Sequence, residues 1–239
     1  ASMFLNIIKN FTRDEFLSLF SGMIIPLLSI VITYGISKLW QRFFQVAPTH
    51  HGSFSSMFTF SNTIFIGLPI NLAIFGEKAV PYVLLYYIVN TSLFWTVGIY
   101  EIARDSPSFE EAKVSFHPLV VLKKIFSPAL IGFIIGLIWM LFDFPLPKFI
   151  AGLGGYLSEL TTPLSMFIIG IIVYYSGIKN LRMTKDLAGV LAGRFLLSPL
   201  IVWLIGQWIQ VPSLMLQVFI IQASMPVQNS VPILVRNYH

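Results

Sequence analysis

Apolar runs without charge recur along this chain and are separated by charged residues. A bilayer core needs about 20 apolar residues in helical form. By this measure five runs can each cross a membrane once: residues 16–37, 52–76, 79–100, 125–142 and 160–178. The run 195–235 has no charge and is twice too long for one crossing, so we expect it to fold back at residues 206–212. The pattern predicts an all-α polytopic membrane protein with seven spans.

Two of these spans are interrupted by proline and flanked by side-chain amides. The first break holds Asn62, Gly67, Pro69 and Asn71, and the second holds Gln222, Pro226, Gln228, Asn229 and Ser230. Gly tolerates unusual dihedral angles and Pro cannot complete the helical ladder, so we expect unwinding at Gly67 and Pro69. Such backbone is tolerated at membrane depth only inside protein or beside a water-filled cavity. A corresponding pair of breaks points to a transporter's binding site.

Composition supports a membrane setting. Hydrophobic residues make up 56% of the chain and charged residues only 10%, whereas a soluble domain carries roughly 25% charged residues. The net charge of +5 would indicate a nucleic-acid partner only if the basic residues formed one face. They are scattered between apolar blocks, so we expect the lipid bilayer as partner and no nucleic acid. The absence of cysteine excludes a disulfide framework and a thiol nucleophile.

Lys and Arg are unevenly divided between the predicted connections. Ten fall in one set of alternate connections and four in the other, which assigns the first set to the cytoplasm. The longest connection, residues 104–124, is hydrophilic and mixed in charge, and we interpret it as a cytoplasmic linker. It divides the chain into an N-terminal repeat, residues 1–103, and a C-terminal repeat, residues 125–239.

The two halves share an order of elements. Thr-Arg-Asp at residues 12–14 precedes a span that contains Pro26, and Thr-Lys-Asp at residues 184–186 precedes a span that contains Pro199. In each half the next span is the one broken by proline. The first copy starts from the sparsely charged side and the second from the cytoplasmic side. Matching order in opposite directions predicts an inverted repeat, which is common in transporters.

Several ordered motifs carry a family resemblance. They are Asn62 with Gly67-Leu68-Pro69, Ser127-Pro128-Ala129-Leu130-Ile131-Gly132, Pro163-Leu164-Ser165-Met166 with Gly170, and Met225-Pro226 through Pro232. The chain resembles the auxin efflux carrier family, which contains bacterial malate-type permeases and plant PIN auxin carriers. One departure is Ile64, where family members often have a smaller residue.

The resemblance implies a fold of the bile-acid-symporter and PIN type. In that fold ten helices form two inverted repeats of five, and the fourth and ninth helices cross at their prolines. Mapped by order, the chain supplies the end of helix two through helix nine and lacks the first and last helices. It also implies a cell-membrane location, which for a bacterial member is the inner membrane.

The chemistry of the breaks suits ions. The N-terminus of a half-helix presents free N–H groups that suit a carboxylate, while C-terminal ends and unwound carbonyls suit a cation. The amides beside the breaks offer neutral donors and acceptors for a substrate. The alternative is that these amides only satisfy backbone freed by proline, or join helices to each other.

Two further polar residues lie inside apolar spans. A charge at the bilayer centre costs about 2.5 to 3.5 kcal/mol, so we expect Arg194 to face protein or water. It either attracts or holds an anionic substrate, or it has a structural role, as an interfacial Arg that snorkels or as one paired with a helix C-terminus. Asn90 either lines the same cavity or packs helices together.

The sequence contains no catalytic motif, nucleotide site or metal-ligand spacing that we recognise, and we expect neither an enzyme nor a cofactor. We interpret the chain as a secondary active transporter of small organic anions, such as malate or auxin-like acids, that works by alternating access around the crossover. The alternative is a membrane sensor with a carrier-like fold that binds a ligand without moving it. Coupling to H+ or Na+ is left open, and the Gly-rich spans permit a homodimer.

Overall fold

The structure is a computed structural model that describes residues 20–106, 131, 135–136, 138–139, 141–142, 144–160, 163–164, 167, 170–171, 174–175 and 183–238. Most of the predicted spans 125–142 and 160–178, like the motif at residues 12–14, lies outside these residues. Contacts divide the chain into two compact units: Ala1–Leu17 with Pro128–Thr184, and Ser18–Ser127 with Lys185–His239. The division into two sequence repeats stays a prediction, since each compact unit takes segments from both sides of the linker.

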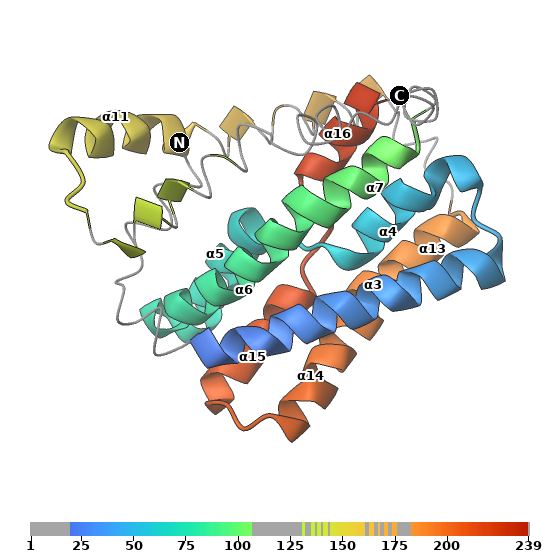
Figure 1. Cartoon of the computed structure of the whole chain (residues 1–239), viewed down its shortest axis with the longest axis horizontal. Helices are drawn as coiled ribbons and strands as arrows, with labels where there is room; N and C mark the ends of the chain where they lie inside the picture. The colour runs from blue at the N-terminus through green and yellow to red at the C-terminus, as the bar shows by residue number, and fades with distance from the viewer. Residues whose placement is uncertain are drawn as a thin grey trace. The chain divides into compact units, whose positions relative to one another are not determined.

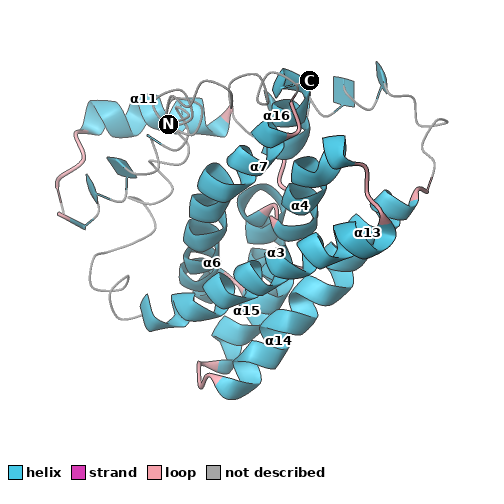
Figure 2. Cartoon of the chain, turned by 45° about the vertical axis from the view of Figure 1, so that its right-hand side comes forward, coloured by secondary structure: helices cyan, strands magenta, loops and turns pink. Residues whose placement is uncertain are grey.

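The described part of the larger unit is built almost entirely from helices (Figure 2). They are α3 (Ile24–Phe44), α4 (His51–Thr59), α5 (Leu68–Phe75), α6 (Val80–Leu93), α7 (Ile99–Arg104), α13 (Lys185–Ala192), α14 (Ser198–Trp208), α15 (Ser213–Ala223) and α16 (Ser230–Tyr238). One-turn π-helices η3 (Thr63–Gly67), η5 (Phe94–Gly98) and η7 (Gly193–Leu197) lead into α5, α7 and α14. In the smaller unit, α11 spans Lys148–Glu159.

Three continuous helices among the described residues are long and apolar enough to cross a membrane: Ser21–Phe44, Val80–Arg104 and Lys185–Trp208. Two shorter apolar helices, Thr63–Phe75 and Ser213–Ala223, belong to interrupted segments, formed by α4 with η3 and α5, and by α15 with α16. The described part of the chain has no strand, only one isolated β-bridge. The predicted all-α membrane fold is therefore confirmed.

Helix ends extend past the predicted limits because charged residues at those ends are paired. The helix of the first predicted span passes residue 37 and reaches Phe44. The helix of the third predicted span, residues 79–100, passes residue 100 and reaches Arg104. Glu101 lies in this extension, where its carboxylate accepts hydrogen bonds from the Tyr34 hydroxyl and the Lys38 ammonium, each at 2.5 Å. A carboxylate paired in this way can be buried at the end of a membrane helix.

The predicted return in the last apolar run is confirmed. Figure 1 shows α14 and α15 as two helices joined by a short loop, and the loop lies between Trp208 and Ser213. The first helix of this run begins at Lys185, ahead of the charge-free residues, and it includes Arg194, as expected. On the outer face of α14, large apolar side chains such as Leu200, Trp203 and Leu204 are exposed, as expected for a lipid-facing helix.

Aromatic side chains fill the core around the breaks. In α6, residues 83–91 are all buried, and the long helix that contains them is the most enclosed of the three long apolar helices. The ring of Phe60, just after α4, meets that of Phe94 edge to face, with 5.5 Å between centroids. Phe58 and Phe54 pack on the other side of α4 with Val46 and Val190. The unwound residues are thereby held in a packed interior.

Candidate functional site at the crossing of two broken helices

The two unwound segments cross and pair with each other through their main chains. The helix α4 ends at Thr59 and α15 ends at Ala223. Ser61 and Val227 form an antiparallel bridge, in which the Asn62 N–H donates to the Pro226 carbonyl at 2.8 Å and the Gln228 N–H donates to the Phe60 carbonyl at 3.2 Å. Peptide groups freed by both breaks thus satisfy each other, as backbone at membrane depth requires.

The first helix unwinds earlier than the sequence suggested. Gly67 has helical dihedral angles, φ −65° and ψ −43°, and Pro69 lies in the first turn of α5, where a missing N–H is tolerated. The extended residues are instead Phe60 to Asn62, and η3 follows them directly. Its wider turn is closed by the Gly67 N–H, which donates to the Asn62 carbonyl at 3.1 Å. The expectation that Gly67 and Pro69 mark the unwound residues was wrong.

Gly67 serves close packing. A Cβ on this residue would lie 2.2 Å from Oε1 of Gln222 in α15. Gln222 is fully buried, and neither its amide oxygen nor its amide nitrogen has a hydrogen-bond partner among the described residues. Nearby, the Asn71 amide nitrogen donates to the Gly67 carbonyl at 2.8 Å, while its amide oxygen is left unpaired. Unpaired buried amides are costly, so these atoms indicate a place where a ligand or water binds.

Asn62 and Asn229 bring the two breaks together through their side chains. The Asn62 amide nitrogen donates to the Asn229 oxygen at 2.6 Å. The Asn62 oxygen accepts from the Phe65 N–H at 3.2 Å and so caps the N-terminus of η3. The amide nitrogen of Asn229 is buried and has no partner in the described part of the chain. It lies one residue before α16, at the N-terminus of the second half-helix.

Asn90 is used as a backbone partner. From the last turn of α6 its oxygen accepts from the Ser61 N–H at 3.1 Å, and its nitrogen donates to the Ser61 carbonyl at 3.0 Å. The side chain therefore pairs with an extended residue much as a neighbouring strand would. These contacts are the ones expected if Asn90 packs helices together. The side chain holds the crossing in place.

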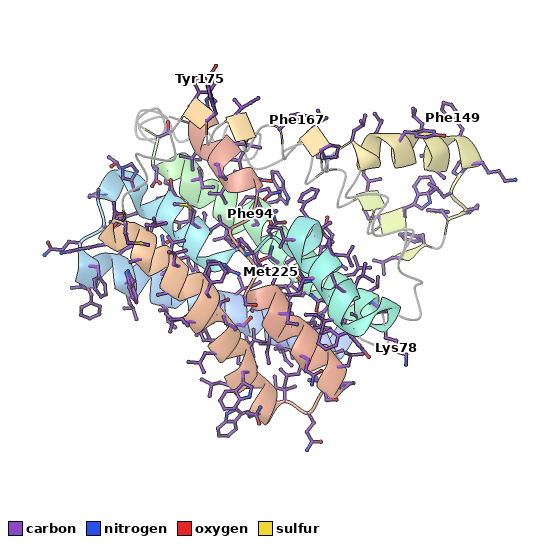
Figure 3. All side chains as sticks on the ribbon, turned by 180° about the vertical axis from the view of Figure 1, so that it is seen from behind. Lys78, Phe94, Phe149, Phe167, Tyr175 and Met225 are labelled. Carbon is purple, nitrogen blue, oxygen red and sulfur yellow. The ribbon has the colours of Figure 1, made fainter. Side chains whose placement is uncertain are left out.

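Arg194 lies against the C-terminal ends of two half-helices. Its side chain is fully buried and donates to main-chain carbonyls of α4, of α15 and of the residues that follow α15. The sequence left open whether Arg194 binds a substrate or has a structural role. The contacts are those of a structural role, in which the guanidinium pairs with helix C-termini. In Figure 3 the label of Met225, one of its partners, lies in the middle of the larger unit.

The remaining predicted residues lie around the crossing with less direct roles. Gln228 is buried and contributes its main chain to the bridge, and Ser230 begins α16. Pro69 is exposed in the first turn of α5. Amides and hydroxyls, with Arg194, make up the polar groups of the crossing, and none of its described hydrogen bonds involves a carboxylate.

A second polar cluster, which the sequence analysis did not anticipate, holds α4 against α7. The Asp105 carboxylate accepts from the Gly52 and Ser53 N–H groups, each at 2.7 Å, and from the Ser53 hydroxyl at 2.6 Å. An acceptor at a helix N-terminus satisfies free N–H groups and opposes the positive end of the dipole. The signal in the sequence was weak: two carboxylates, Glu101 and Asp105, directly after an apolar span.

Gly67→Ala is expected to displace the Gln222 side chain and to cost about 1 to 3 kcal/mol of stability, as overpacking does. The clash is with the end of a flexible side chain, so the protein should still fold. Thermal unfolding of the detergent-solubilised protein measures the effect. Gly35→Ala in α3, where no atom lies within 4 Å of the added carbon, is the control and should lose no stability. Equal melting temperatures for the two variants would contradict the close contact.

Comparisons with known proteins agree with this architecture. A family model described as a membrane transport protein matches residues 1–238. An uncharacterized transporter of Methanocaldococcus jannaschii is 24% identical over 231 residues, which cover 95% of this chain and 72% of the relative. An uncharacterized transporter of Methanothermobacter thermautotrophicus is 29% identical over 167 residues, which cover 69% of this chain and 51% of the relative.

Proposed function

Because this chain belongs to the membrane transport protein family, we propose that it is a secondary active transporter of small organic anions, such as malate or auxin-like acids. Family membership confirms the resemblance to auxin efflux carriers that the motifs indicated. The protein is an integral membrane protein, and its relatives are named as transporters. Substrate class and mechanism are the parts that we propose.

The electrostatics of the crossing support an anionic substrate. Two half-helices, η3 with α5 and α16, begin at the crossing, and each N-terminus carries a partial positive charge of roughly half an elementary charge. The opposing C-terminal ends are occupied by Arg194. No carboxylate takes part in the described hydrogen bonds of the crossing, so the positive ends lack a protein counter-charge there.

One observation carries the proposal: unpaired amide donors lie beside these N-termini. The amide nitrogens of Gln222 and Asn229 are buried and lack partners among the described residues, and each can donate to a carboxylate oxygen. The unpaired oxygens of Gln222 and Asn71 can accept from a hydroxyl, such as that of a hydroxy acid. The set has the donors and acceptors that a small carboxylate would use.

The arrangement also supports alternating access by an inverted repeat. Continuous helix α3 is followed by the broken pair α4 and α5, and continuous α13 with α14 is followed by the broken pair α15 and α16. The unwound residues of the two pairs meet antiparallel, the direction that inverted copies would take. We propose that the crossing opens to one side of the membrane at a time.

Gln222→Met is the sharpest test of the site. Methionine keeps the length of the side chain but removes both unpaired polar atoms, so the melting temperature should be unchanged or higher. For carboxylate uptake, the ratio of the maximal rate to KM should fall by about tenfold or more, which is the effect of one lost hydrogen bond to a charged group. Both are measured on purified protein, the second in proteoliposomes with radiolabelled malate and a panel of mono- and dicarboxylates.

The control is Gln207→Met on the exposed face of α14, which should change neither quantity. Saturable uptake that is unaffected by Gln222→Met would remove this residue from the site. Absence of uptake for every carboxylate, together with no thermal stabilisation by any of them, would overturn the proposal. Thermal stabilisation without uptake would instead favour the sensor alternative.

A further inference from the structure

Arg194 is a fully buried cation without an acidic partner among the described residues. Its side chain is 0% exposed, and the ion pairs of the described residues involve only Glu101, which binds Lys38 and Arg104. A guanidinium in this position has five N–H groups to satisfy. An isolated buried charge costs several kcal/mol, so its surroundings must supply the compensation.

Main-chain carbonyls supply that compensation. The Arg194 Nε donates to the Met225 carbonyl at 3.2 Å, and one terminal nitrogen donates to Thr59 at 2.6 Å and Phe58 at 3.4 Å. The other terminal nitrogen donates to Ala223 at 2.6 Å and Met225 at 3.2 Å. The guanidinium thus makes five contacts with four main-chain carbonyls, since the Met225 carbonyl accepts twice.

These carbonyls belong to two helix C-termini that meet at the crossing. Thr59 is the last residue of α4 and Ala223 is the last residue of α15. Each C-terminus carries roughly half a negative elementary charge, so the two together balance one positive charge. The guanidinium is thus matched to this pair of helix ends in charge and in hydrogen bonds.

The local structure around Arg194 allows its guanidinium to reach the two helix C-termini. Arg194 lies in η7, a π-helical turn, and its neighbour Gly193 packs directly on α4. A Cβ on Gly193 would lie 2.5 Å from the ring of Phe58. Only glycine leaves room for the Phe58 ring against this turn, next to the place where Arg194 reaches the carbonyls at the end of α4.

The same carbonyls are what a coupling cation would use. In carriers with broken helices, unwound carbonyls and half-helix C-termini coordinate Na+. The Thr59 hydroxyl, buried here without a partner in the described part of the chain, would be a further oxygen ligand. We propose that Arg194 is a resident cation that takes the place of a coupling Na+, so that this protein holds its crossing together and works without sodium.

This inference rests on the proposed function only in treating the crossing as part of a carrier. Its first test needs no variant. Replacing Na+ by choline in the buffer should leave the melting temperature of the purified protein unchanged, and should leave any uptake unchanged. A melting temperature or an uptake rate that depends on Na+ would overturn the proposal.

The second test removes the resident cation. Arg194→Ala leaves a space lined by carbonyls, which guanidinium ion at low-millimolar concentration, or Na+, should fill. In choline buffer the variant should be strongly destabilised, and addition of guanidinium or Na+ should raise its melting temperature by about 5 °C or more. Choline is too large to enter, and the native protein, whose site is filled, should show no rise.

Arg194→Gln, which keeps volume and removes the charge, repeats the test in case the alanine variant does not fold in choline. Recovery of folded protein by purification with guanidinium or Na+ supports the proposal. No stabilisation of either variant by guanidinium or Na+ overturns it. Because these melting temperatures are measured without substrate, their outcome is independent of whether carboxylates are transported.

Discussion

Gly52→Ala should prevent the protein from reaching a stable folded state. An added Cβ would lie 1.7 Å from the Glu101 carbonyl oxygen and 2.3 Å from its carbonyl carbon. Both are main-chain atoms of α7, so no side-chain rotation relieves the clash. The N-terminus of α4 would have to move away from α7, and it would then lose the bonds from the Gly52 and Ser53 N–H groups to the Asp105 carboxylate.

The expected loss is at least about 3 kcal/mol, the sum of overpacking and of weakened hydrogen bonds to a charged group. Size-exclusion chromatography in detergent should show aggregate in place of a single peak, and thermal unfolding should show a much lower transition. Gly152→Ala in α11, with no atom within 4 Å of the added carbon, is the control and should behave as the native protein. A normal peak and melting temperature for Gly52→Ala would contradict the packing of α4 on α7.

Asn90→Leu should open the crossing by removing a side-chain partner of Ser61. Leucine has the branching of asparagine but is larger and offers neither donor nor acceptor, so the N–H and carbonyl of Ser61 would lose their side-chain partner. The Ser61 carbonyl still accepts from the Thr63 N–H at 3.0 Å, but the Ser61 N–H would be left unpaired in a fully buried place, which costs about 1 to 3 kcal/mol. We expect a lower melting temperature and the loss of transport, because the bridge between Ser61 and Val227 shares the same residue.

Thr96→Val on the same membrane helix is the matched control. Its hydroxyl is exposed and bonds only within its own helix, to the Ser92 carbonyl at 2.7 Å and the Leu93 carbonyl at 3.3 Å. The melting temperature of this variant should stay close to that of the native protein. Comparable melting temperatures for Asn90→Leu and Thr96→Val would show that Asn90 does not hold the crossing.

Several features of the site could be predicted from the sequence. The breaks near Asn62 and Pro226, the return before Ser213 and the family resemblance were all visible as local patterns. The place of the first unwinding was not, because Gly67 suggested a flexible backbone and in fact meets Gln222. A glycine needed for close contact and a glycine needed for its dihedral angles look the same in a sequence.

The roles of the polar residues were equally hidden. Asn62, Asn71, Asn90 and Gln222 are all amides within apolar runs, yet the oxygen and nitrogen of Asn90 both have partners and those of Gln222 have none among the described residues. Arg194 had two readings in the sequence, and the choice between them depends on carbonyls of two other helices. No pattern within one helix distinguishes these cases.

The sequence by itself determined that this is a helical membrane protein with two interrupted apolar segments, because hydrophobic length and charge act within one segment of chain. Tertiary structure alone decided which polar groups meet. Asn90 finds Ser61 across 29 residues, and Asn62 finds Asn229 across 167. Hydrogen bonds depend on distances of about 3 Å between atoms. Such distances follow from how separate helices pack, which the order of residues along one helix does not record.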